Sequence, residues 1–217
     1  MCNLFSITAG PSAIRELTRA MADTTGNLAP QPAVFPDQPA PVVRNLEDGG
    51  RELTLMRWGF PAPPNAGSHP VTNVRNTRSP YWRAWLKPEW RCVVPATSFS
   101  EYEDTKPRKT PTWFALDESR PLFCFAGIWR PWTGTRKAAE GEQEHRLFSF
   151  LTCPPNAVVA PIHPKAMPAI LTTREEIDTW LTAPADVALG LQRPLPDDAL
   201  AIVARGQRRD GPDELLA

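Results

Sequence analysis

Proline constrains this chain more than any other residue, because its 217 residues include 26 prolines that recur along the whole length. A proline fixes its own backbone φ angle and has no N–H to donate, so it interrupts helices and the inner strands of sheets. The even spread argues against one proline-rich linker and predicts many short elements joined by rigid turns. We therefore expect no long helix.

Length and apolar content suit a single domain, because hydrophobic residues make up 41% of the sequence and can bury a core. The expected strands and helices do not alternate regularly, and no internal repeat occurs. We predict an α+β fold with a curved, mainly antiparallel β-sheet or barrel and a few short helices. The domain spans residues 1–217, with its core at about 2–205 and a peripheral tail at 206–217.

Apolar segments between turn residues predict about eight or nine strands. They lie at residues 4–7, 42–44, 52–58, 91–103, 112–116, 122–129, 146–153, 169–172 and 200–203. Helices are predicted to begin at Pro11 and Pro80, behind Gly10 and Ser79, and after a capping box of Thr173 and Glu176. The first of them places Ile14, Leu17 and Met21 in the core. Segments 30–41 and 134–145 are predicted loops, the second charged and mobile.

The cysteines and apolar segments indicate where the protein works. No segment reaches the ~18 uninterrupted apolar residues of a membrane span, so we expect a cytoplasmic protein that does not bind membranes. The four cysteines lie far apart without the spacing of a zinc site or a disulfide framework. We expect Cys92, Cys124 and Cys153 to be core thiols, and we expect neither a metal nor a cofactor.

Charge is unevenly distributed although the net charge is zero. Residues 53–100 contain six basic side chains against one acid, whereas the segment from residue 174 onward is acidic. Arginine outnumbers lysine 19 to 5, and its guanidinium group suits bidentate contacts to phosphate. A phosphate-binding face is one interpretation, and an ordinary solvated surface with ion pairs is the other.

Met1-Cys2 carries the most specific chemistry in the sequence. If Met1 is removed, Cys2 presents a thiol and a free α-amine on adjacent carbons. The amine can condense with an aldehyde to an imine, and the thiol can then close a five-membered thiazolidine. An α-amine titrates near pH ~7.7 to 8.0 and a cysteine thiol near ~8.5, so we expect the chemistry to need no large pKa shift. The alternative is that Cys2 simply begins a strand.

Glu101 and Trp58 each allow two interpretations. Glu101 lies between aromatic residues in a predicted strand, where it is either a solvent-facing strand residue or a site carboxylate. Trp58 ends a strand beside a proline-rich loop, which is typical of a core residue but also of a surface that stacks on bases. The local sequence favours the solvent-facing glutamate and the core tryptophan.

Several short motifs, taken in order, resemble the SOS-response-associated peptidase (SRAP) family, from Cys2 to about Val203. The motifs are Met1-Cys2, Trp58-Gly59-Phe60-Pro61, Asn73-x-Arg75, Glu101 before Tyr102, and His163-Pro164 ahead of Met167-Pro168. The resemblance implies a DNA-repair autopeptidase of the SOS response that removes its own Met1. It then links Cys2 covalently to an abasic site in single-stranded DNA, with lyase-like chemistry. We expect a monomer that joins the nucleoid when DNA is bound. Junctions between single- and double-stranded DNA are one expected location, with no preferred junction assigned.

The resemblance also implies roles for individual residues. Cys2 is the nucleophile, and Glu101 is a general acid/base for Met1 removal and ring chemistry. His163 shuttles a proton or activates the sugar hydroxyl, while Asn73 holds Cys2 and the lesion in place. The residues expected to contact DNA are Arg75, Arg78, Lys165 and Trp58.

The sequence departs from the family pattern at two places. Many members begin Met-Cys-Gly-Arg, whereas Asn3-Leu4 follow here, so a phosphate contact by that early arginine is lost. Lys165-Ala166 likewise replace the arginine often found before Met-Pro. We expect these changes to alter DNA affinity or geometry and to leave the covalent chemistry intact.

Two other classes of protein fit parts of the pattern. N-terminal-nucleophile amidohydrolases also expose a cysteine after Met removal, and its own α-amine acts as the base. Their glycine-rich substrate motifs are absent from this sequence. The other class is a single-strand DNA-binding module that uses arginines and aromatic residues without reaction.

Overall fold

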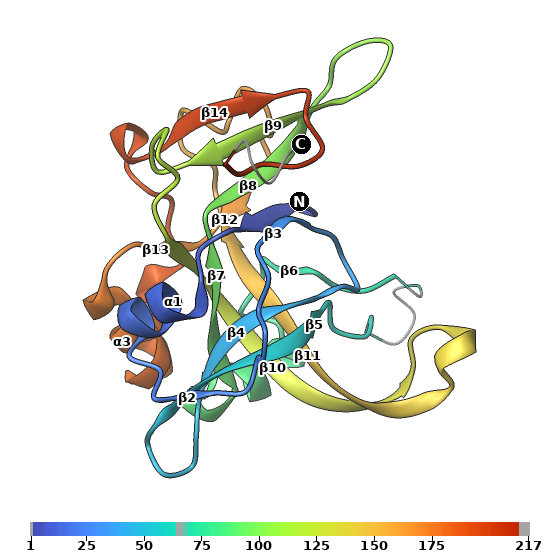
Figure 1. Ribbon diagram of the computed structural model, residues 1–217, viewed down its shortest axis with the longest axis vertical. Coiled ribbons are helices and arrows are strands. Elements are labelled where there is room, and N and C mark those ends of the chain that lie inside the picture. The colour runs from blue at the N-terminus through green and yellow to red at the C-terminus, as the bar shows by residue number, and fades with distance from the viewer. Residues whose placement is uncertain (1, 64–66, 68, 213–217) are drawn as a thin grey trace.

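The computed structural model describes residues 2–63, 67 and 69–212, and the strands of this part form two sheets (Figure 1). The smaller sheet has the strand order β14 (Ala201–Arg205), β9 (Thr110–Ala115), β8 (Ser98–Glu103), β1 (Phe5–Ile7) and β3 (Gln31–Val34). All its pairings are antiparallel. The predicted α+β class is confirmed.

The larger sheet closes into a barrel. Its main strands are β4 (Pro39–Asn45), β5 (Arg51–Trp58), β7 (Arg91–Ala96), β10 (Phe123–Thr135) and β11 (Glu142–Cys153). β11, β10, β7, β4 and β5 pair antiparallel in that order, and a parallel pairing of β5 with β11 completes the ring. Two-residue strands extend it: β2 (Ala22–Asp23), β6 (Asn73–Val74), β12 (Met167–Pro168) and β13 (Ile170–Leu171).

The helices of the described residues are short, as the prolines predict. They are α1 (Pro11–Thr18), α2 (Pro80–Arg83), α3 (Arg174–Thr182) and α4 (Ala185–Ala188), with single 3-10 turns at 84–86, 88–90, 138–140, 189–191 and 197–199. Proline stands in the first turn of α1 and of α2, where its missing N–H costs no helical bond. The predicted capping box is half confirmed at α3: the Thr173 side chain accepts a bond from the Glu176 N–H, but the Glu176 carboxylate accepts from the Thr172 N–H and not from that of Thr173.

Aromatic side chains fill the barrel core. The Trp58 ring stacks on Phe150 with centroids 5.2 Å apart, and Phe5 packs edge-on against Trp58 at 5.1 Å. Trp58 has no exposed surface, and its Nε1 donates to the Thr72 carbonyl at 3.1 Å. The core interpretation of Trp58 is therefore confirmed and its predicted contact with DNA is wrong, because the ring presents no face to a base. Cys92, Cys124 and Cys153 are buried, as predicted.

The predicted strand at 91–103 is two strands in different sheets. β7 belongs to the barrel and β8 to the smaller sheet, and the chain crosses from one to the other at Thr97. The Thr97 N–H and hydroxyl both bond to the Ser6 carbonyl, which fixes the crossing against β1. Burial continues through the crossing from β7 as far as Glu101 on β8, so it does not mark the boundary between the two strands.

Both predicted loops contain strand. Segment 30–41 includes β3, which tolerates Pro32 because it lies at the edge of its sheet. Segment 134–145 belongs to a long hairpin in which β10 and β11 pair as far as Thr135 and Glu142, the yellow arm of Figure 1. Gly134 is a residue of β10. The strand has a glycine there because a Cβ at this position would overlap the Trp132 ring.

The ends of the predicted core also need correction. α1 ends at Thr18, before Gly26, so Met21 lies beyond the helix and is 79% exposed. The tail at 206–217 was predicted to be peripheral, but Asp210 has no exposed surface. Residues 213–217 of that tail lie outside the described part of the chain, and so does Met1.

Candidate active site

Cys2 lies three residues before the start of β1 and is fully buried. Its Sγ approaches the Leu4 carbonyl at 3.4 Å and the Ser100 carbonyl at 3.9 Å. Burial, and then the negative charge of Glu101, raise the pKa of the Cys2 thiol far above its ordinary range. The expectation that no large pKa shift is involved is therefore wrong for the chain as it stands. The thiol is protonated at neutral pH and needs a base to react.

Asn73, on β6, contacts Cys2. Its Nδ2 donates to the Cys2 carbonyl at 2.8 Å and to the Thr72 hydroxyl at 2.7 Å. The Thr72 hydroxyl in turn donates to Asn3 Oδ1 at 3.1 Å. Both protons of the Asn73 amide are thus used, which fixes its orientation beside Cys2.

Glu101, on β8, is not a solvent-facing strand residue, because only 3% of its surface is exposed. Burial raises the pKa of Glu101 to about 7. A carboxyl group with that value exchanges protons freely at neutral pH, which is the property a general acid/base needs.

His163 faces Glu101 from the turn that precedes β12. Its Nδ1 lies 3.8 Å from Glu101 Oε2, and its side chain is 17% exposed. Burial, together with the positive charges of Lys165 and Lys109, lowers the pKa of His163. The imidazole is therefore neutral at pH 7 and can either accept or donate a proton. Cys2, Asn73, Glu101 and His163 are thus brought together, as the sequence predicts.

Three predicted DNA contacts lie on the surface beside these residues. Arg75 and Arg78 are exposed and line one pocket of about 430 Å³ together with Thr152 and Gln192. Arg75 Nη1 donates to the Lys165 carbonyl at 2.6 Å, and the Lys165 side chain is also exposed. The arrangement gathers positive charge from two distant segments.

Thr72, Asn3 and Ser100 are site residues that the motifs do not identify. Thr72 links Asn3 to Asn73, and Ser100 supplies a carbonyl to the Cys2 thiol. Among the described residues, Asn73 Oδ1 and the hydroxyls of Ser100 and Thr152 are buried without a hydrogen-bond partner. Buried polar atoms of this kind are uncommon, and they leave capacity for a bound substrate.

The fold is shared with solved structures of distant sequence. A protein from Bordetella bronchiseptica aligns with a TM-score of 0.70 and 23% identity over 94% of this chain and 98% of its own. A protein from Bacteroides thetaiotaomicron aligns with a TM-score of 0.69 and 23% identity over 92% and 90%. These likenesses define the fold class.

The family model for SOS response associated peptidase (SRAP) matches residues 1–205, so the chain belongs to this family. The abasic site processing protein YoqW of Bacillus subtilis is 31% identical over 164 residues, which are 72% of this chain and 68% of YoqW. The abasic site processing protein YobE of the same organism is 30% identical over 72% of this chain and 70% of its own. No helix of the described residues is long and apolar enough to cross a membrane.

Proposed function

We propose that this chain processes abasic sites in single-stranded DNA, and that it does so by a covalent thiazolidine linkage through Cys2 after removing its own Met1. The observation that carries the proposal is the group of buried Cys2, Asn73 and Glu101 with half-buried His163, in which a carboxyl with a pKa of about 7 adjoins the only thiol that can carry an α-amine. The relatives named as abasic site processing proteins support the choice of substrate.

The first step releases the nucleophile. Hydrolysis of the Met1–Cys2 peptide bond consumes one water and yields methionine and the Cys2 α-amine. Glu101 takes a proton from the attacking nucleophile and returns it to the departing amine. Asn73 Nδ2, which donates to the Cys2 carbonyl, holds that residue in register while the bond breaks.

The second step captures the lesion. The ring-opened sugar of an abasic site is an aldehyde, and the Cys2 α-amine condenses with its C1′ to an imine with loss of one water. The thiol then adds to the imine carbon, forming the C–S bond, while its proton passes by way of Glu101 to the nitrogen. Because the thiol pKa lies far above that of Glu101, proton transfer to Glu101 must accompany C–S bond formation. Neutral His163 can accept the proton of the C1′ hydroxyl as the ring opens, while the ring oxygen O4′ gains a proton.

Intact mass spectrometry tests the proposal directly. Purified protein should lack Met1, and incubation with an abasic oligonucleotide should add the oligonucleotide mass less one water. Cys2→Ala should form no adduct that survives denaturing electrophoresis. DNA binding without an adduct would favour the non-covalent binding module, and glutamine hydrolysis without aldehyde capture would favour the amidohydrolase class.

We further propose that Arg75, Arg78 and Lys165 contact the phosphates of the strand. Their exposed charges beside the pocket at Thr152 support this assignment. The Arg75 guanidinium is oriented by carbonyls of two segments, so its position is fixed before DNA arrives. Loss of the early arginine, with Leu4 in its place, leaves these residues a larger share of the phosphate binding.

A further inference from the structure

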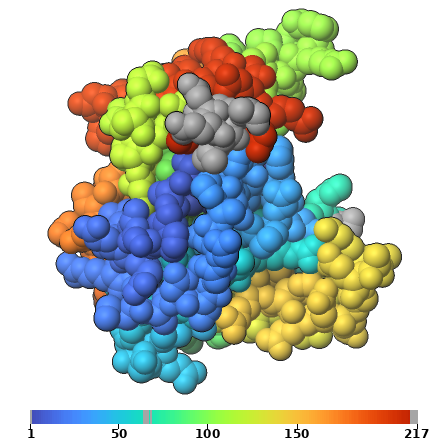
Figure 2. Space-filling view, viewed as in Figure 1, coloured from blue at the N-terminus to red at the C-terminus, as the bar shows by residue number. Residues whose placement is uncertain are grey.

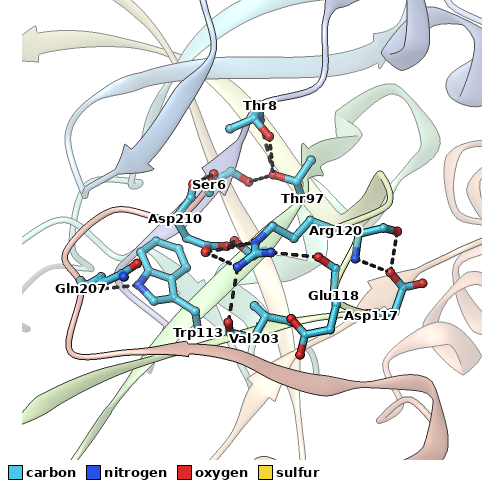
Figure 3. Close-up of polar contacts among 12 residues, drawn as sticks. Ser6, Thr8, Thr97, Trp113, Asp117, Glu118, Arg120, Val203, Gln207 and Asp210 are labelled. Carbon is cyan, nitrogen blue, oxygen red and sulfur yellow. Dashed lines mark hydrogen bonds and ion pairs between the residues drawn. The ribbon is translucent and has the colours of Figure 1, made fainter. Parts of the chain in front are cut away.

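Asp210 is a fully buried carboxylate outside residues 1–205, the part of the chain that the family model matches. Arg120, in the turn between β9 and β10, bonds to both of its oxygens through Nε and Nη2 at 2.9 to 3.0 Å (Figure 3). Burying a carboxylate is costly unless it is paired and hydrogen-bonded, and the guanidinium fork provides both. Figure 2 shows the red C-terminal segment seated beside the yellow-green turn before β10, above the blue N-terminal third.

Asp210 also touches three neighbouring segments of the smaller sheet. The Ser98 hydroxyl on β8 donates to Oδ2 at 2.5 Å, and the Ser6 hydroxyl on β1 donates to the Asp210 carbonyl at 2.7 Å. The Asp210 N–H donates to the Pro32 carbonyl on β3 at 2.8 Å. One residue therefore bonds to β1 and to both strands beside it.

The pairing of β1 within the smaller sheet is short. It pairs with β8 over only two residue pairs, Phe5 with Phe99 and Ser6 with Ser98, and its pairing with β3 contains a register shift. A slip of one residue turns every side chain of a strand to the opposite face. Cys2 precedes β1 and Glu101 lies on β8, so such a slip would separate the two.

We propose that Asp210 and Arg120 form a positioning clasp that fixes the register of β1 against β8 and so holds Cys2 beside Glu101. Asp210 bonds to Ser6 and to Ser98, which lie directly opposite each other on β1 and β8. Ser6 is four residues after Cys2, and Ser98 is three residues before Glu101. It acts through these strands and touches no reacting atom. The positioning role rests on the proposed function, because its purpose is the geometry of that reaction.

The test compares Asp210→Asn with a matched control, Asp178→Asn. Asp178 on α3 also pairs with arginines, Arg19 at 2.7 Å and Arg51 at 2.6 Å, but it makes no bond to β1 or β8. A milder variant, Ser98→Ala, removes only the bond from β8 to the carboxylate and keeps the test possible if Asp210→Asn does not fold. Thermal unfolding establishes that each variant is folded.

Amide hydrogen exchange measures whether the Asp210 clasp stabilises the pairing of β1 with β8. The amides of Ser100 and Thr97 donate to the Leu4 and Ser6 carbonyls across the β1–β8 pairing. Asp210→Asn and Ser98→Ala should exchange faster at these two amides than wild type, whereas Asp178→Asn should not. Unchanged exchange at Ser100 in both clasp variants would overturn the proposal whatever the chemistry does.

The rate of adduct formation at saturating abasic single-stranded DNA tests whether the clasp positions Cys2 beside Glu101. Asp210→Asn should be about 10- to 100-fold slower, because misplacing a reacting group by ~1 Å can cost about 10²-fold. Its affinity for DNA with a non-reactive tetrahydrofuran site should equal that of wild type. An equal slowing in Asp178→Asn, or faster exchange with an unchanged adduct rate, would overturn the positioning role. If wild type itself forms no adduct, the proposed function fails, and the clasp loses its catalytic purpose with it.

Discussion

The pKa of Glu101 lies above that of His163, which reverses the usual order of a carboxyl group and an imidazolium. Burial raises the pKa of Glu101 to about 7 and lowers the pKa of His163 below its ordinary 6.5. A carboxyl group that is a weaker acid than the imidazolium beside it favours the neutral pair, a protonated acid with a neutral base. Such a pair can donate a proton from one member and accept one at the other without creating a buried charge first.

The raised pKa of Glu101 predicts how stability depends on pH. The folded protein keeps this proton at pH values where the unfolded chain, with a pKa near 4.5, has lost it. The contribution of Glu101 to stability therefore falls as pH rises from about 4.5 to about 7 and stays low above that. Glu101→Gln, which is neutral throughout, should raise Tm relative to wild type more at pH 8 than at pH 4.5.

The matched control for this measurement is Glu103→Gln, two residues along β8. Glu103 is ion-paired with Arg205 near the surface, so its loss should lower Tm slightly at pH 8. Thermal unfolding at the two pH values distinguishes the variants. A Tm difference for Glu101→Gln that does not depend on pH would show that the carboxyl titrates normally.

Glu101→Gln should also slow the chemistry without weakening DNA binding. General acid/base groups typically contribute ~10² to 10⁴ in rate, so adduct formation should slow by about that factor when Met1 has been removed by other means. In wild type the rate should rise with pH to a plateau, with its midpoint at about 7, the pKa of Glu101. Equal rates in samples with verified N-termini would leave Glu101 without a catalytic role.

Helix capping shows at the scale of elements what a sequence pattern can and cannot establish. Both Thr173 and Ser79 occupy the N-cap position of a helix, as predicted. Only Thr173 makes the expected bond, from the Glu176 N–H, and it does so with φ −119° and ψ 158°, whereas Ser79, with φ −60° and ψ 133°, makes no side-chain cap bond. The residue type selects the position, and the local backbone decides whether the bond forms.

This difference predicts unequal effects of the same substitution. Thr173→Ala should destabilise the protein by about 1 kcal/mol, the usual cost of losing an N-cap bond. Ser79→Ala should cost much less, because no cap bond is lost. Chemical denaturation of both variants at one pH gives the comparison. Equal losses would mean that the Ser79 hydroxyl caps α2 in solution.

The sequence predicts where most strands lie, but it gives no prediction of which strands pair with each other. The strand at 52–58 and the hairpin strands at 122–129 and 146–153 follow from apolar residues bounded by turns. The crossing at Thr97 leaves no local signal, because both strands that it joins are buried. Glu101 could not be placed from its neighbours either, since its face of β8 is covered by His163, which is far away in sequence.

At the scale of the whole molecule, the site lies where the two sheets meet. Cys2 precedes β1 of the smaller sheet and Glu101 lies on β8 of that sheet, whereas Asn73 is part of the barrel sheet. The motifs identified these residues, but their common location depends on barrel closure and on the crossing at Thr97. No sequence window contains that information, because the residues are up to 161 positions apart, from Cys2 to His163.

The exposed arginines predict a salt dependence of DNA binding. Each phosphate contact on single strands contributes a slope of about −0.7 to log K against log salt concentration, because counterions are released. Arg75→Ala should reduce the slope by about that amount per phosphate lost. Arg19→Ala is the control, since Arg19 is exposed but paired with Asp178. Titrations with a tetrahydrofuran oligonucleotide measure both, and an unchanged slope for Arg75→Ala would remove Arg75 from the phosphate-binding face.

Burial of the thiols bears on how many lesions one protein chain can capture. All four cysteines lie in the described part of the chain, and all are buried, so a small electrophile in solution meets no exposed thiol. Cys92, Cys124 and Cys153 also have pKa values raised by burial, which keeps them in the unreactive thiol form. Under the proposed reaction only Cys2 combines a thiol with an amine, so each chain can capture one lesion. The number of protein molecules joined to DNA would then count the lesions one for one.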